Sequence, residues 1–182
     1  GHHAARPGGD LPGAGLARSS ELRLHDRVEL ERLYLAWPTV PLFHADDAAL
    51  TILADILTRG RASRLYRHLV VERELAQDVT AYHASRELAG SLGAYATLRP
   101  GRSLAEARDR IDSEIGRIAT EGVGPDELAR VKNGRLAGFF YALESIGGFG
   151  GVADRLNAYN TYLNDPGRIT TDFGRYQAVD AA

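Results

Sequence analysis

The chain contains no cysteine, no methionine and only one tryptophan among its 182 residues. The absence of cysteine excludes disulfides, a thiolate nucleophile and a cysteine metal site. A net charge of −2 provides no basic surface of the kind that nucleic-acid readers carry. No apolar run approaches the ~20 residues that span a bilayer, and no secretory signal opens the chain. We therefore expect no nucleic-acid partner and no membrane span, and the missing initiator methionine indicates a piece of a longer protein.

The overall composition predicts one globular domain with a flexible start. Hydrophobic residues make up 44% of the chain and charged residues 25%, which is ordinary for a soluble protein. Residues 1–20 are rich in glycine, proline, alanine and arginine and have no periodicity, which is typical of a flexible linker or a tag remnant. His2 and His3 fall in this part and support no metal site. We expect a single α+β domain over residues 21–182.

Residues 48–79 form the stretch around which the chain is organised. Apolar side chains recur at the spacing of one buried helical face, at Leu50, Leu53, Ala54 and Leu57. Gly60 stands where a left-handed residue would end this helix, and Ser63 is placed to cap the next one. The stretch therefore predicts two helices joined by a tight turn and followed by a strand.

The segments on either side of this stretch predict strands. Apolar and polar residues alternate over 22–30, and residues 33–37 are almost continuously apolar. We expect a strand or strand pair that ends at Pro38, with its last part buried on both faces. Residues 79–98 predict a hairpin whose turn lies at 87–90.

The C-terminal half predicts helices. Ser103 and Glu106 have the spacing of a capping box, and Pro125 stands in the first turn of the next helix. A further helix runs to about Leu163, and residues 171–179 begin another. The element order β-α-α-β-β-α-α-α predicts an α+β two-layer sandwich, with helices on one face of a mostly antiparallel sheet.

An ordered series of residues resembles the pitrilysin–insulinase family of zinc metallopeptidases, and more narrowly its second, non-catalytic type of domain. The series comprises Leu57, Gly60, Ser63, Arg64, Leu65, Tyr66, Leu69, Glu72, Leu75 and Ala76. Residues 33–37 resemble the opening strand of that domain, and residues 144–151 and 156–162 are similar to long bacterial members. The resemblance implies the metallohydrolase fold of the mitochondrial processing peptidases. It also implies a domain that continues past Ala182, so that a truncated sheet edge would favour self-association.

The residues that would carry zinc chemistry are missing. A catalytic domain of this family carries His-x-x-Glu-His on a helix. None of the six histidines stands in that motif; they are His2, His3, His25, His44, His68 and His83. We interpret the pair His68 and Glu72 as a surface contact. We interpret His44, Asp46 and Asp47 as the start of a helix with capping aspartates, in preference to a metal cluster.

The resemblance also locates the positions at which active relatives contact substrate with an arginine and a tyrosine. These positions are Val70 and Gln77 here, so both contacts are missing. The turn at 58–63 corresponds to a glycine-rich substrate loop of the processing peptidases, but its shortness favours a plain interhelical turn. Gly147 to Gly151 lacks the context of a phosphate loop and is better explained by a hinge or by close packing. Asn157, Asn160 and Tyr162 are interpreted as a hydrogen-bonded helix surface in preference to a cavity wall.

These observations predict no catalytic, substrate-binding or metal residues in the segment, and no cofactor. Zinc would be bound in the catalytic domain of the parent protein. The expected function is that of a non-catalytic domain in a zinc metalloendopeptidase, where it forms part of a chamber that encloses a peptide. Its partners would be the zinc-bearing domain and the peptide, in the periplasm or cell envelope. The alternative is a structural or assembly domain from a catalytically inactive relative, and whether the parent is an enzyme stays open.

Overall fold

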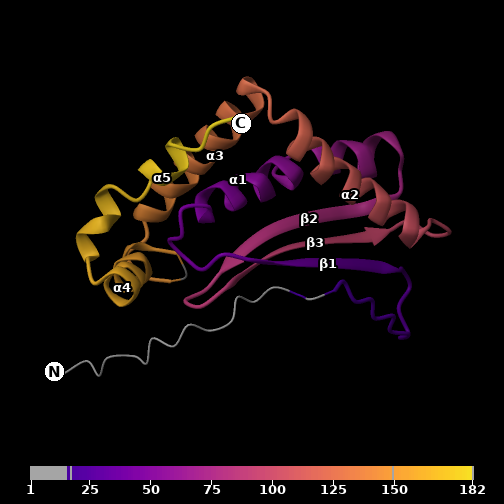
Figure 1. Cartoon of the computed structure of the whole chain (residues 1–182), viewed down its shortest axis with the longest axis horizontal. Coiled ribbons are helices and arrows are strands. Elements are labelled where there is room, and N and C mark those ends of the chain that lie inside the picture. The colour runs from indigo at the N-terminus through magenta and orange to yellow at the C-terminus, as the bar shows by residue number, and fades with distance from the viewer. Residues whose placement is uncertain (1–15, 17, 149, 182) are drawn as a thin grey trace.

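The computed structural model describes residues 16, 18–148 and 150–181, so most of the expected linker at 1–20 lies outside the described residues. Its sheet consists of strands β1 (Arg32–Thr39), β2 (Ala76–Ser85) and β3 (Gly90–Leu98) in the antiparallel order β1-β3-β2. The long helices lie over one face of this sheet (Figure 1). The predicted α+β architecture, with an antiparallel sheet and helices on one face, is confirmed.

The helices follow the predicted order with different boundaries. They are α1 (Asp47–Thr58), a π-helix (Tyr66–Glu72), α2 (Leu104–Glu121), α3 (Pro125–Leu143), α4 (Val152–Leu163), a 3₁₀ helix (Pro166–Thr170) and α5 (Gly174–Gln177). The second helix of the organising stretch is therefore of the wide π type for seven residues. The predicted helix over 171–179 is reduced to the single turn of α5.

The prediction for the first strand was partly wrong. Residues 22–30 form no strand, and Leu22 and Leu24 are each 80% exposed. Strand β1 alternates between exposed and half-buried residues and is not buried on both faces. It lies at the edge of the sheet and pairs only with β3. One of its faces remains open to solvent because the helices cover only the other side of the sheet. Pro38 is tolerated within this strand because an edge position needs no N–H from it on the open side.

Helix α1 buries two of its faces, and this places it at the centre of the molecule. Toward the sheet, Leu57 joins a core with Leu65, Leu69 and Ile111. On the opposite side, Ile52 and Ile56 pack against residues of α3 in a second core. The sequence pattern had identified only one apolar face. The second becomes visible only when α3 is placed over α1 (Figure 1).

The predicted cap at Ser63 is wrong, and the predicted cap of α1 is right in position but lacks a side-chain bond. The Ser63 side chain is fully buried, and its hydroxyl donates to the carbonyl of Gly60 at 2.6 Å, so it does not accept from a helix N–H. Asp46 stands at the N-cap of α1 but makes no side-chain cap bond, while the neighbouring Asp47 is buried. The turn before Ser63 is as predicted, because Gly60 adopts a φ of 81° in the left-handed region that favours glycine.

The cap of α2 is confirmed: the Ser103 side chain accepts from the backbone N–H of Glu106 at 3.3 Å. Replacing a serine cap with alanine leaves an unpaired N–H at the helix start. We expect Ser103→Ala to lower the free energy of unfolding by about 1 kcal/mol, measured by urea denaturation. Ser103→Asp should retain most of the stability, because a carboxylate also accepts this bond. An unchanged midpoint for Ser103→Ala would contradict the assigned cap.

Candidate functional site

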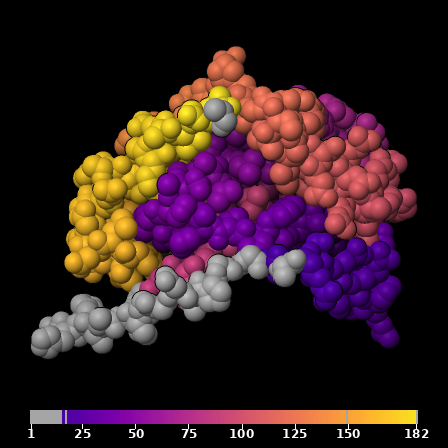
Figure 2. All heavy atoms as spheres, viewed as in Figure 1, coloured from indigo at the N-terminus to yellow at the C-terminus, as the bar shows by residue number. Residues whose placement is uncertain are grey.

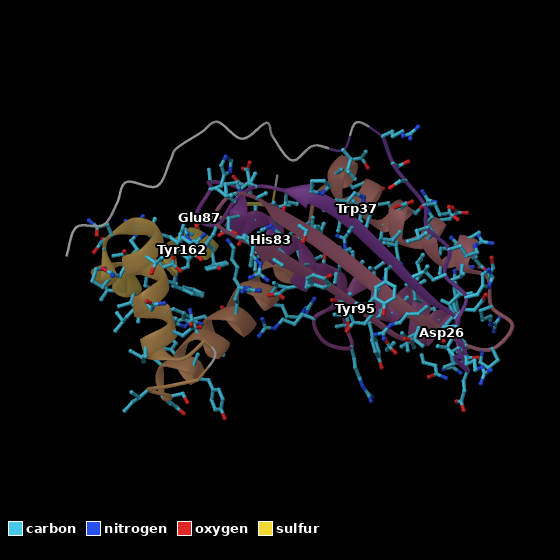
Figure 3. All side chains as sticks on the ribbon, turned by 90° about the horizontal axis from the view of Figure 1, so that it is seen from below. Asp26, Trp37, His83, Glu87, Tyr95 and Tyr162 are labelled. Atoms are coloured by element: carbon cyan, nitrogen blue, oxygen red, sulfur yellow. The ribbon has the colours of Figure 1, made fainter. Side chains whose placement is uncertain are left out.

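A buried histidine lies between the sheet and α1. His83 comes from β2, and its side chain has no exposed surface. Its Nε2 lies 3.0 Å from the Thr39 hydroxyl of β1, and its Nδ1 lies 3.1 Å from the Thr51 hydroxyl of α1. Figure 3 shows His83 within the body of the molecule, behind the sheet. Both ring nitrogens are therefore occupied by groups of the protein itself.

A network of charged groups continues from this histidine to the C-terminal segment. Asp47 Oδ1 lies 3.6 Å from His83 Nδ1, and its Oδ2 accepts from Arg175 at 2.6 Å. Arg175 also donates to Asp172 Oδ1 at 2.6 Å, and the Tyr159 hydroxyl donates to Asp172 Oδ2 at 2.9 Å. The two carboxylate side chains are only 3% and 6% exposed. The network therefore joins β2, α1, α4 and the segment before α5.

Burial sets the protonation state of this network. It lowers the pKa of His83 more than the neighbouring Asp47 carboxylate raises it. Burial alone would also lower the pKa of Arg175, but hydrogen bonds to Asp172 and Asp47 raise it above its usual range. Burial and the Asp172 charge raise the pKa of Tyr159 to about 12. At neutral pH the network consists of a neutral histidine and a neutral tyrosine with one arginine between two aspartates.

The outer face of the sheet presents a different chemistry. Tyr34 and Tyr95 lie directly opposite each other on β1 and β3, with ring centroids 6.0 Å apart. The Arg32 guanidinium lies 4.4 Å from the Tyr95 centroid and 5.4 Å from that of Tyr34. Tyr82 of β2 covers Gly93, where an added Cβ would come within 2.4 Å of the tyrosine ring. The row of tyrosines thus crosses all three strands.

This row is open to solvent, with Tyr34 67% exposed and Tyr82 47% exposed. Figure 3 views the sheet from this side and shows the Tyr95 ring projecting toward the viewer, away from the helices. We name the surface formed by Arg32, Tyr34, Tyr82 and Tyr95 the tyrosine face. Flat aromatic rings with polar ends are suited to contacts with another polypeptide, since they offer large apolar area at low entropic cost.

The two positions that correspond to substrate contacts in active relatives differ in their surroundings. Val70 packs against the main core from the π-helix. Gln77 is exposed at the start of β2, where the register shifts between Ala76 and Asp78, so it occupies a β-bulge. A valine held in the core cannot extend toward a substrate.

The histidine and glutamate pair of the π-helix is more than a surface contact. His68 Nε2 lies 3.7 Å from Glu72, but its Nδ1 lies 2.9 Å from Glu114 of α2. Its side chain is 19% exposed. His44 is exposed and close to Asp46, at 3.6 Å. Within residues 16, 18–148 and 150–181, no three histidine or acidic side chains come together as a metal group, so the described part of the chain does not fit a zinc ion.

The glycine-containing segments form tight turns. Gly148 and Gly150 have φ values of 83° and 79°, and an added Cβ at Gly151 would meet the Gly147 carbonyl oxygen at 2.6 Å. Close packing therefore explains Gly151. At the turn between α1 and the π-helix, Arg59 donates to the Gly134 carbonyl of α3 at 3.0 Å, which ties that turn to the helical layer.

A groove of about 680 Å³ runs along the exposed side of α1. Its walls are mainly apolar and include Leu50 and Leu53 of α1, Ile118 of α2 and Val179 near the C-terminus. Figure 2 shows α1 in violet between the yellow C-terminal segment and the rose-coloured α2. In the part of the chain that the structure describes, no helix is both long and apolar enough to cross a membrane.

Sequence reasoning missed both the buried network and the tyrosine face. Asp47, His83 and Arg175 are far apart in the chain, and no local pattern connects them. The tyrosine face did leave a signal, because Tyr34 alternates with the half-buried Leu33 and Leu35 and must therefore point to the opposite side of the strand. An aromatic residue on the side of a strand away from the core is therefore the sequence signal that indicates the tyrosine face.

The family model described as the peptidase M16 inactive domain matches residues 12–135. No curated protein matches the chain. The match covers the sheet, α1, the π-helix, α2 and part of α3.

Three solved structures are similar in fold. A protease from Helicobacter pylori gives a TM-score of 0.76 at 23% identity, over 86% of this chain and 37% of that one. The inactive peptidase domain of a proposed zinc protease from Bordetella parapertussis gives 0.70 at 19% identity, over 85% of this chain and 81% of that one. The periplasmic protease PqqL from Escherichia coli gives 0.54 at 13% identity, over 86% and 17%. The chain thus spans about a third of the Helicobacter pylori protease.

The depressed pKa of His83 predicts that acid destabilises the fold. The unfolded chain takes up a proton near the ordinary histidine pKa of about 6.5, while the folded chain excludes it until lower pH. We expect the free energy of unfolding to fall as the pH drops below about 6.5, by at most about 1.4 kcal/mol per pH unit for this group. Urea denaturation at several pH values should show a shallower slope for His83→Gln. The exposed His44→Gln serves as the control and should keep the wild-type slope; equal slopes in all three would contradict the assignment.

Removing the arginine of the network leaves two buried carboxylates without a cationic partner. We expect Arg175→Leu to lower the free energy of unfolding by roughly 3 kcal/mol, because breaking a buried ion pair from one side costs about that much. Thermal or urea denaturation measures the loss. Arg168→Leu, at an exposed position of the 3₁₀ helix, is the matched control and should change stability by less than about 0.5 kcal/mol. Equal effects of the two substitutions would show that the network does not hold the C-terminal segment.

Proposed function

Because the chain belongs to the family of peptidase M16 inactive domains, we propose that it forms part of the peptide-enclosing chamber of a zinc metalloendopeptidase. In this proposal the zinc ion and the bond-breaking residues belong to another domain of the same parent protein. This segment contributes shape and contact surface, and bond chemistry takes place elsewhere.

The observation that carries the proposal is the open tyrosine face on one side of a sheet whose other side is buried. Tyr34 and Tyr82 are 67% and 47% exposed there, and their strands β1 and β2, which lie on either side of β3, are the two edge strands of the described sheet. A peptide in extended form can stack on such rings or pair with such an edge. A surface of this kind suits a chamber wall that contacts peptides of many sequences without selecting one sequence.

A second candidate function is a structural or assembly role in a catalytically inactive parent. It is favoured by Val70, which lies in the core at the position where the family resemblance expects a substrate-binding arginine. The two functions predict different properties of the parent protein. The chamber function requires about one zinc per chain and hydrolysis of peptides, and the structural function requires neither.

We also propose that the parent acts in the periplasm or cell envelope. The support is the shared fold with PqqL, which is described as a periplasmic protease of Escherichia coli. Fractionation of cells that produce the full-length parent tests this proposal, and recovery with the cytoplasmic fraction would refute it.

The test of the chamber function uses the full-length parent. We expect it to bind about one zinc and to cleave unfolded peptides in a chelator-sensitive way, whereas this segment alone does neither. In the parent, Tyr34→Ser combined with Tyr82→Ser should reduce kcat/KM for peptides by about five- to 150-fold, since each of the two aromatic contacts contributes about 0.5–1.5 kcal/mol. Zinc content should not change, because these residues lie outside the metal-binding domain.

The matched control is Tyr141→Ser, because Tyr141 is 76% exposed but lies on α3, away from the sheet. It should leave kcat/KM at the wild-type value. If the parent contains no zinc and shows no peptidase activity, the result favours the structural function over the chamber function. A zinc-bearing, active parent in which the double variant cleaves normally would show that the tyrosine face does not contact the peptide.

A further inference from the structure

A polar cavity of about 350 Å³ lies on the helical side of the molecule, remote from the tyrosine face. Its walls are supplied by the π-helix and the residues just before it, by α2 and by the first turns of α3. Its volume is at the lower end of the range of small-molecule sites, about 300–1,000 Å³. Unlike the groove along α1, it is lined mainly by charged side chains: four arginines, one histidine and two glutamates.

One wall of the cavity is formed by an ion pair that is already complete. Arg64 donates from Nη2 to Glu127 Oε2 at 2.8 Å, and its Nε lies 3.2 Å from both carboxylate oxygens. The two side chains are 17% and 22% exposed. This bidentate geometry satisfies both charges, so the pair forms a wall and leaves other groups to bind a ligand.

Glu114 is the group whose bonding is incomplete. Its side chain is 7% exposed, and its Oε1 accepts from Arg117 at 3.2 Å and lies 2.9 Å from His68 Nδ1. Its Oε2 is buried and has no hydrogen-bond partner among the described residues. An ionised carboxylate accepts up to about four hydrogen bonds, and an unmet one in a buried position is costly. Glu114 lines the cavity, and the terminal torsion of glutamate is broad, so its carboxylate can adjust to a donor that enters there.

The mouth of the cavity carries the opposite charge. Arg67 and Arg117 are more than half exposed, and each also contacts a glutamate outside the cavity, Glu72 at 3.0 Å and Glu121 at 3.6 Å. Arg130 of α3 is exposed and has no acidic partner within the described part of the chain. Among the described residues, the cavity thus combines a buried carboxylate oxygen of Glu114 that lacks a donor with an exposed Arg130 that lacks an acidic partner.

We propose that this cavity binds a small zwitterion of the amino-acid class, such as a dipeptide, with its ammonium group on Glu114 and its carboxylate on Arg130. A simple anion would satisfy the arginines but would leave the buried oxygen of Glu114 without a donor. A simple cation would pair with Glu114 but would be repelled by the arginines. A ligand with both charges matches both ends, and the proposal does not depend on the zinc-bearing domain because every residue lies within this chain.

The test measures binding of alanyl-alanine to the complete 182-residue chain by isothermal titration calorimetry. We expect saturable binding with a dissociation constant on the order of 1 mM. N-acetyl-alanyl-alanine, which lacks the ammonium group, and alanyl-alanine amide, which lacks the carboxylate, should each bind about tenfold more weakly. Inorganic phosphate, which has no ammonium group, should also bind more weakly than the dipeptide.

Variants separate the two ends of the site. Glu114→Gln should weaken alanyl-alanine binding about tenfold, whereas Asp109→Asn, at an exposed position of the same helix, should not change it. Arg130→Gln should also weaken binding about tenfold, with the exposed Arg102→Gln as its control. Arg130 is a surface residue, so this comparison holds even if Glu114→Gln fails to fold. Equal binding of the dipeptide and its acetylated form, tighter binding of phosphate, or no saturable binding at millimolar concentration would each overturn the proposal.

Discussion

Burial of α1 on two opposite sides is the constraint from which most of this structure follows. One side packs on the sheet through Leu57, and the other receives α3 through Ile52 and Ile56. A helix with apolar residues on two faces must be covered on both. The sheet supplies only one cover, and the helical layer of the C-terminal half supplies the other. The order of elements along the chain is therefore what α1 requires: strands on one side, and helices folded back over the other.

The charged network compensates the buried carboxylate at the N-terminal end of α1. Asp47 is buried there, and a buried carboxylate is tolerated only when it is paired and hydrogen-bonded. Arg175 reaches it from a part of the chain 128 residues away and is itself held by Asp172. Because α5 is only four residues long, its position depends on these charged contacts as well as on apolar packing. Burial beneath the helix lowers the pKa of His83 and keeps it neutral, although the Asp47 carboxylate acts in the opposite direction.

The molecule thus offers two surfaces of different chemistry on opposite sides of one core. The tyrosine face is flat, aromatic and formed by strands, which suits contact with an extended polypeptide. The cavity beside the π-helix is small, charged and formed by helices, which suits a compact ligand with fixed charges. In the described part of the chain, neither surface brings together three histidine or acidic side chains that could hold a metal ion.

The order of helices and strands, the hairpin, the Ser103 cap and the left-handed Gly60 were all determined by the sequence, because each depends on residues within a few positions of one another. The same local reasoning failed for residues 22–30, where apolar and polar residues alternate but no strand among the described residues pairs with them. It failed for Ser63, whose hydroxyl turns back to the Gly60 carbonyl.

Only the tertiary structure decided which charges meet. His83 lies between threonines 44 and 32 residues away in sequence, and Glu114 approaches His68 only when α2 packs beside the π-helix. Hydrogen bonds and ion pairs act over a few ångströms, and the folded topology sets those distances, whereas the sequence records only the order of residues.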